Sequence, residues 1–117
     1  MEELKIYYRK IIGNEQIRPS DIRVDKLSIT HCEIPSEAIA KLNIAVNDED
    51  MLENICERLF RVMNNYELNP LSHGHPEGGH QGWISHQRSH TSMSVGDVIC
   101  VMGEYIMCDD FGWTPIV

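Results

Sequence analysis

Histidine is the residue type in this chain with the clearest potential for chemistry. Neutral imidazole is a common ligand for zinc and other transition metals. If the segment around His73 and His75 were extended, both rings would point the same way, because alternate side chains of a strand share a face. Five of the six histidines lie between residues 73 and 90, namely His73, His75, His80, His86 and His90. A metal site would be built on His73, His75, His80 and His90.

The surroundings of these histidines weaken the metal interpretation. Residues 69–91 are rich in glycine, and the four cysteines form no Cys-x-x-Cys pair. The histidine spacing matches no established zinc pattern. We therefore predict a polar, solvated loop without a cofactor. A module binding zinc or another transition metal, or a metal-dependent hydrolase, stays open as the alternative.

Other catalytic arrangements are less well supported. Cys100 or Cys108 could pair with His90, but both thiols lie in an apolar run flanked by acids, which disfavours the reactive thiolate. The glycines between residues 74 and 82 lack the Lys-Ser/Thr pair of a phosphate-binding loop. The sequence thus favours a protein that is not an enzyme.

Large aromatic side chains suggest a different role. Tryptophan is enriched at the centres of protein interfaces, although most large aromatics simply pack on a core. We predict that a protein partner is contacted by Trp83, Ile84, His86 and Trp113.

The strongest structural pattern lies near the C-terminus. Residues 98–102 form a dense apolar run that predicts a strand, followed by a link at Gly103-Glu104 and a second strand over residues 105–108. Gly96 can take a backbone conformation closed to other residues, and Asp97 is expected to bond its own backbone two residues on. The sequence therefore predicts a β-hairpin that starts at a turn.

The central part of the chain predicts one amphipathic helix. It would begin at Asn47 or Asp48 and end at Asn64-Asn65. Its apolar residues recur at steps of three and four, which places them on one face that needs a sheet to cover. This stripe comprises Leu52, Ile55, Cys56, Leu59, Val62, Met63 and Tyr66.

Further strands are expected on either side. Residues 4–12 and residues 27–34 predict strands. Residues 36–46 are ambiguous, because Ser36 could cap a helical turn through residue 42 and residues 42–46 could instead be extended. Residues 113–117 contain Pro115 and predict an edge strand or a tail. The fold expected is a single α+β domain over residues 1–117: an antiparallel sheet of about four or five strands with one helix across it. A partly closed barrel of the PUA/ASCH kind is the alternative.

The charge distribution restricts the class of partner. The net charge is −8, and residues 62–117 hold six acids against one base, Arg88. An acidic surface repels phosphate, so direct binding of DNA or RNA is disfavoured. The N-terminus lacks the features of a secretory signal, and no apolar run is long enough to cross a bilayer. We expect a cytoplasmic protein without a membrane contact, and a homodimer stays open.

The C-terminal half carries a family resemblance. Residues 92–99 read Ser-Met-Ser-Val-Gly-Asp-Val-Ile and are followed by a strand containing Tyr105 and by Gly112-Trp113. Together with the helix end at residues 59–64, this pattern resembles the YodL-like family from about residue 55 onward. That family comprises small, mostly uncharacterised proteins of bacteria, phages and other mobile elements, and it brings no assigned activity. The resemblance implies a phage or mobile-element origin.

These observations together favour one function. We expect a non-enzymatic accessory protein of a phage or mobile element that binds a host protein, as an inhibitor of a host defence or regulatory complex. Its contacts would come from the acidic C-terminal half and from the loop over residues 69–91.

Overall fold

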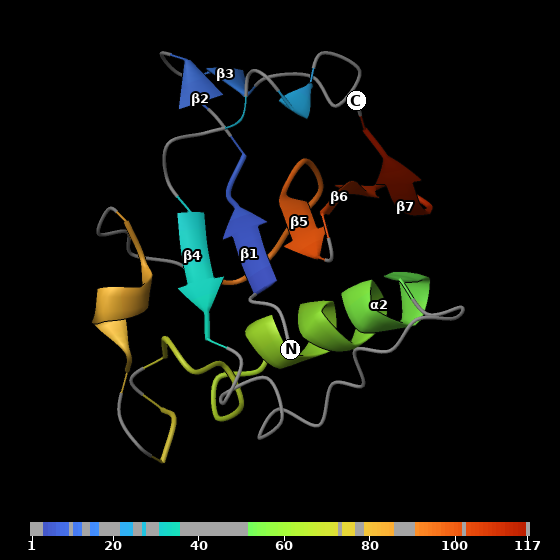
Figure 1. The fold of residues 1–117 in the computed structure, drawn as a ribbon. Helices are drawn as coiled ribbons and strands as arrows, with labels where there is room; N and C mark the ends of the chain where they lie inside the picture. The colour runs from blue at the N-terminus through green and yellow to red at the C-terminus, as the bar shows by residue number, and fades with distance from the viewer. Residues whose placement is uncertain are drawn as a thin grey trace.

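The chain folds as an antiparallel sheet with a helix across one face, which confirms the α+β prediction (Figure 1). The computed structural model describes residues 4–9, 11–12, 15–16, 22–24, 27, 31–35, 52–72, 74–76, 79–85, 91–101 and 103–116. The sheet has five strands in the order β4-β1-β5-β6-β7. Their bounds are β1 Leu4–Tyr7, β4 His31–Ile34, β5 Val98–Val101, β6 Glu104–Asp109 and β7 Gly112–Pro115. The helix α2 spans Leu52–Met63, and a short 3-10 helix η3 spans Gln81–Trp83.

The sheet is open, so the barrel alternative is wrong. It ends at β4 on one side and at β7 on the other, and every neighbouring pair is antiparallel. The strand predicted over residues 4–12 is also interrupted. Only its first part joins this sheet as β1, while β2 (Ile11–Ile12) pairs with β3 (Glu15–Gln16) in a separate two-stranded sheet. The strand predicted over residues 27–34 is β4 in its C-terminal half, and the ambiguous residues 36–46 lie outside the described residues.

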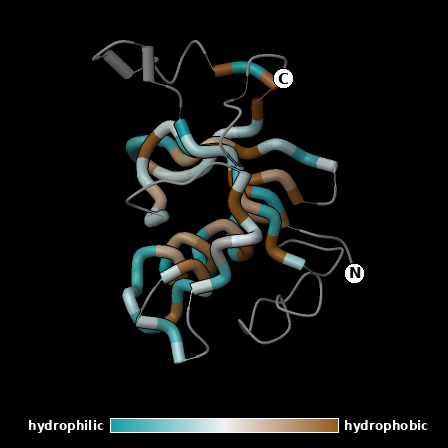
Figure 2. Tube along the Cα trace, turned by 90° about the vertical axis from the view of Figure 1, so that its left-hand side faces the viewer, coloured by the Kyte–Doolittle hydropathy of each residue, from teal (hydrophilic) through white to brown (hydrophobic). Residues whose placement is uncertain are grey.

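The core lies between α2 and the sheet. The helix buries Ile55, Cys56, Leu59 and Met63 against apolar side chains from β1, β4, β5 and β6. Figure 2 shows the hydrophobic segments gathered where the helix and the sheet meet. The predicted stripe is confirmed over α2 but is wrong at Tyr66, which follows the helix and is 69% exposed. The predicted start of the helix lies outside the described residues.

Asparagine side chains end the helix, as the sequence predicts, and they also tie it to a distant segment. The Asn65 Oδ1 atom accepts the backbone N–H groups of Glu67 and Leu68. Asn69 is buried, and its Nδ2 donates to the Met63 carbonyl at 2.8 Å, which satisfies one of the open carbonyls at the helix end. The Asn64 Oδ1 accepts the N–H of Met93 at 2.7 Å. This bond between Asn64 and Met93 fixes the segment that leads into β5 against the end of the helix.

The turn into β5 explains the Ser-Val-Gly-Asp sequence. The N–H of Asp97 donates to the Ser94 carbonyl at 3.1 Å, with Gly96 at φ +95°, which favours glycine as expected. Gly96 donates to the Cys108 carbonyl, and the Cys108 N–H donates to the Asp97 carbonyl. Two residues thus oppose one, which is a glycine-containing β-bulge. The bulge places the Asp97 side chain inside the protein.

Two details of this hairpin differ from the prediction. The buried Asp97 carboxylate does not bond its own backbone two residues on; its Oδ1 accepts the N–H of Arg9 at 2.7 Å and its Oδ2 accepts the N–H of Ser94 at 2.9 Å. The carboxylate therefore joins the end of β1 to the turn. The link between β5 and β6 also lies one residue earlier than expected, because Val101 pairs with Glu104.

Neither edge of the sheet is a regular, fully open strand. The sequence leaves residues 113–117 open between an edge strand and a tail, and the structure shows an edge strand, β7, over Gly112–Pro115. The N–H of Ile116 donates to the Tyr105 carbonyl, so Pro115 and Ile106 are a pair without ladder hydrogen bonds. The backbone nitrogen of Pro115 therefore faces outward, and its lack of an N–H group removes no hydrogen bond between β6 and β7. At the other edge, residues 84 and 85 lie along β4.

Candidate functional site

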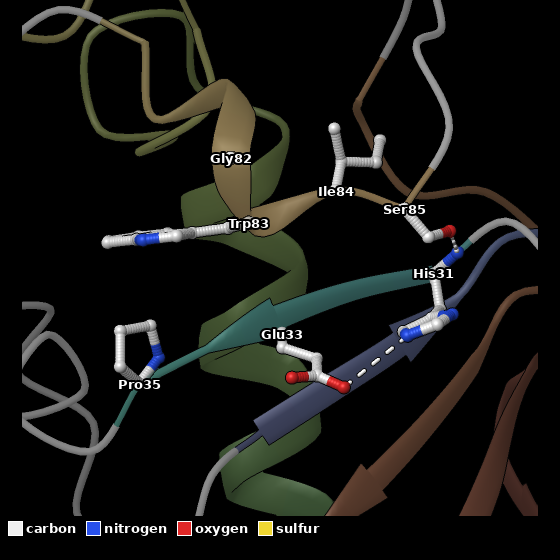
Figure 3. Close-up of a pocket in the computed structure, with 7 residues that line it drawn as sticks. All are labelled: His31, Glu33, Pro35, Gly82, Trp83, Ile84 and Ser85. Atoms are coloured by element: carbon white, nitrogen blue, oxygen red, sulfur yellow. Dashed lines mark hydrogen bonds and ion pairs between the residues drawn. The ribbon is translucent and has the colours of Figure 1, made fainter.

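The candidate site is an open pocket between β4 and the segment that contains η3 (Figure 3). It lies on the face of the sheet away from α2, because alternate residues of β4 point to opposite faces and Cys32 and Ile34 fill the core. Its volume is about 480 Å³. The lining residues are His31, Glu33, Pro35, Gly82, Trp83, Ile84 and Ser85.

Backbone contacts along the edge of β4 position the outer wall. Ile84 forms an isolated antiparallel bridge with Cys32. The Ser85 N–H donates to the His31 carbonyl at 2.8 Å, and the His31 N–H donates to the Ser85 Oγ at 2.9 Å. A side-chain oxygen thus takes the place of a strand carbonyl. These bonds keep η3 beside the strand and fix one side of the pocket.

Trp83 provides the aromatic surface of the pocket. Its indole is half-buried against the core and stacks on the His80 ring, with centroids 4.2 Å apart and planes 5° from parallel. His80 is itself held by its backbone N–H, which donates to the Pro70 carbonyl at 2.9 Å. Figure 3 shows the indole edge-on beside Pro35 and Glu33. Because His80 covers one face and does not line the pocket, the opposite face is turned toward the pocket.

Glu33 provides the charge. Its Oε1 lies 3.7 Å from Lys5 Nζ and 3.4 Å from His31 Nε2. Both ion pairs use the same oxygen, and within the described residues no ion pair or hydrogen bond is made by Oε2. The side chain is 46% exposed, so the interactions with Lys5 and His31 are screened and weak. One carboxylate oxygen therefore stays open to a ligand.

Of the four histidines predicted to bind a metal, the structure describes two. The rings of His75 and His80 lie 6.1 Å apart at 63°, while His73 and His90 are outside the described residues. Among the residues that the structure describes, no group of three or more His, Cys, Asp or Glu side chains is arranged to hold a metal ion. The zinc site stays a prediction.

Metal analysis tests that alternative directly. We expect protein purified without a histidine tag to contain less than about 0.1 equivalents of zinc, nickel, iron or manganese, because the spacing of the histidines matches no established zinc pattern. Elemental analysis by mass spectrometry gives the measurement. One equivalent of metal that is lost in a His75→Ala variant would instead support the metal-binding alternative.

Of the four residues predicted to contact a partner, the three that the structure describes do not lie together. Trp83 and Ile84 line the pocket, and His86 lies outside the described residues. Trp113 belongs to β7 at the opposite edge of the sheet, where its Nε1 donates to the Glu57 Oε1 at 2.9 Å. Its ring also meets Phe60 edge-on with centroids 6.1 Å apart. Trp113 thus braces β7 against α2.

The cysteines are free thiols, and burial makes three of them poor nucleophiles. Burial, with a smaller contribution from Glu33, raises the pKa of Cys32 to about 12. Burial also raises the pKa of Cys56 to about 12 and that of Cys108 to about 11, helped by nearby acidic groups. These thiols stay protonated at neutral pH, which argues against a nucleophilic role for Cys108.

Sequence reasoning missed the β4 residues of the site. The sequence predicts a strand over residues 27–34 and assigns no role to His31 or Glu33, yet the two are two residues apart and share a face when the strand forms. A histidine and a glutamate on the solvent face of a strand are a signal that the sequence does contain. Ser85 and Pro35 carry no such signal, because their role depends on how two distant segments meet.

Comparisons with protein families, with curated proteins and with solved structures found no match to this chain. The resemblance to the YodL-like family therefore stays a prediction that rests on the residues quoted above. Within the described part of the chain, no helix is both long and apolar enough to cross a membrane.

Proposed function

We propose that this chain is a non-enzymatic protein that binds a host protein and receives part of that partner in the pocket between β4 and η3. The observation that carries the proposal is the pairing of an aromatic face with an open carboxylate oxygen: Trp83 forms one wall and the Glu33 Oε2 another. Concave sites with an apolar wall and a few polar groups are the usual form of binding sites.

A second aromatic side chain supports a binding role. Phe111 lies in the turn between β6 and β7 and is fully exposed. The turn is braced, because the Asp109 Oδ1 accepts the Asp110 N–H at 2.8 Å and the Asp109 Oδ2 accepts the Thr114 hydroxyl at 3.0 Å. An aromatic group on a braced turn loses little conformational freedom when a partner covers it.

The resemblance and the charge of the chain favour a more specific biological role. We propose that the protein comes from a phage or mobile element and inhibits a host defence or regulatory complex, as the YodL-like resemblance suggests. The net charge of −8 supports a partner with a basic surface, because complementary charge speeds association and favours the correct partner.

Affinity capture from host-cell lysate tests the proposal. We expect the wild-type chain to retain a defined host protein and a Trp83→Ala variant to lose at least about 90% of it, because truncating a central tryptophan typically costs 2 kcal/mol or more, roughly 30-fold in affinity. The captured amount is measured by quantitative mass spectrometry. Size-exclusion chromatography then measures whether the purified pair forms a complex.

A matched control separates binding from folding. Tyr66 is an exposed aromatic that does not line the pocket, so Tyr66→Ala should capture as much as the wild type. Circular dichroism checks that both variants melt as the wild type does. Equal capture by the Trp83→Ala variant, or a monomeric chain that retains nothing, would contradict the proposal.

A further inference from the structure

We infer that the pocket binds a guanidinium group, and that the group is the side chain of an arginine in the partner. The inference rests on the proposed function, because it names the chemistry that the pocket would recognise. It depends on three features: the open oxygen of Glu33, the face of Trp83 opposite His80, and the position of Pro35 beside the indole in the pocket wall (Figure 3).

The carboxylate favours a cation and leaves room for one. Lys5 and His31 both approach the Oε1 of Glu33, at 3.7 and 3.4 Å, so a ligand at Oε2 need not displace either of them. Figure 3 shows the two oxygens pointing in different directions, with Oε1 on the dashed line to His31. A charged hydrogen bond to this oxygen is stronger than a neutral one. The net charge of −8 further disfavours an anionic ligand.

The aromatic wall selects a flat cation. One face of the Trp83 ring is covered by His80, 4.2 Å away and nearly parallel, and the other face is turned to the pocket. Tryptophan is the best aromatic partner for a cation above its face. The stacked His80 also holds the indole in place, so the surface exists before the ligand arrives.

Guanidinium fits these walls better than ammonium does. A guanidinium group is planar, stacks on aromatic rings, and keeps its N–H donors at its edge, where the Glu33 carboxylate lies. An ammonium group is compact and strongly hydrated, and Lys5 already places one beside this carboxylate. The geometry of a stacked cation with a carboxylate at its edge is therefore specific to arginine-like ligands.

Trp83 fluorescence provides the test. The chain has two tryptophans, so a Trp113→Phe variant leaves Trp83 as the reporter. The probes are N-acetylarginine amide, N-acetyllysine amide carrying a free side-chain amine, and N-acetylcitrulline amide, which keeps the shape of arginine without its charge. We expect saturable quenching by the arginine probe and at least about tenfold weaker binding of the other two. The Trp83 indole N–H resonance of the unsubstituted protein gives a second readout, should the Trp113→Phe variant not fold.

Two glutamate variants test whether the arginine probe binds at the Glu33 carboxylate. Glu33→Gln keeps the shape of the side chain and should weaken the arginine probe by about tenfold or more, since it removes the charge. Glu67→Gln makes the same change at an exposed acid that does not line the pocket, and it should leave binding unchanged. Equal binding of arginine and citrulline probes, or an unchanged affinity in Glu33→Gln, would overturn the inference.

The source of the guanidinium is decided by a further pair of probes. Free arginine and acetyl-Gly-Arg-Gly amide share the same group, and tighter binding of the peptide supports an arginine within a protein chain. Tighter binding of free arginine would contradict an arginine within a protein chain and would indicate a site for a small molecule. If the arginine probes fail while Trp83→Ala still abolishes host-protein capture, the inference is wrong and the proposed function stands.

Discussion

Replacing Asp97 with alanine is expected to lower the free energy of unfolding by about 3 kcal/mol, because it leaves two backbone N–H groups without their acceptor. The carboxylate is 1% exposed and accepts the N–H of Arg9 at 2.7 Å and the N–H of Ser94 at 2.9 Å. No water can easily replace an acceptor that is buried this deeply. The loss would open both the end of β1 and the turn into β5.

Chemical denaturation followed by circular dichroism measures this loss. Asp97→Asn should have an intermediate effect, because an amide keeps one acceptor oxygen but turns a donor toward an N–H group. Asp110→Ala removes an exposed acid from the turn between β6 and β7 and should change stability by less than about 0.5 kcal/mol. An Asp97→Ala protein as stable as Asp110→Ala would show that the buried carboxylate does not hold the fold together.

Alkaline conditions are expected to destabilise the protein strongly. Burial in the folded state raises the pKa of Cys32 and Cys56 to about 12 and that of Cys108 to about 11, against 9.0 for an ordinary thiol. Below about pH 9 these thiols are protonated in both states, so their stabilising contribution is fully present there. Above pH 9 the unfolded chain loses protons first, and stability falls as the pH rises toward 11 to 12.

The expected loss in the free energy of unfolding from pH 8 to pH 10 is about 1.4 kcal/mol for each buried thiol, or about 4 kcal/mol for the three together. Unfolding in urea at several pH values gives the measurement. Lysines and tyrosines also titrate in this range, so the comparison is made with Cys32→Val, which should lose about one third of the pH dependence. An identical pH dependence in the variant and the wild type would contradict the role assigned to the buried thiols.

The elements near the C-terminus could be predicted because their signals are local. The apolar run in β5, the positive φ that glycine allows at position 96 and the fixed φ of proline at position 115 depend on those residues and their neighbours alone. The apolar stripe of α2 is predictable for the same reason, but the spacing wrongly includes Tyr66, which lies beyond the end of the helix. Asn65 and Asn69 outweigh the spacing, because their side chains form hydrogen bonds with backbone groups at the helix end.

The remaining features depend on contacts between distant parts of the chain. Asp97 carries a turn signal, but its main partner, Arg9, is 88 positions away, and no local pattern indicates that bond. The pocket depends in the same way on Ser85 and His31, which are 54 positions apart. The histidines direct attention to residues 73–90, and the structure places Trp83 and Ile84 of that segment in the wall of the pocket. Their contact with a partner stays a prediction.

The proline in β7 has a consequence for self-association. Strand edges that carry regularly spaced N–H groups invite a second copy to add its own strand, and repeated addition leads to fibrils. Along the described β7, the backbone nitrogens of Trp113 and Pro115 face outward, and only that of Trp113 carries an N–H group that can donate a hydrogen bond to another strand. A dimer of this protein that exists in solution is therefore expected to form through side-chain surfaces and not by extension of the sheet across β7.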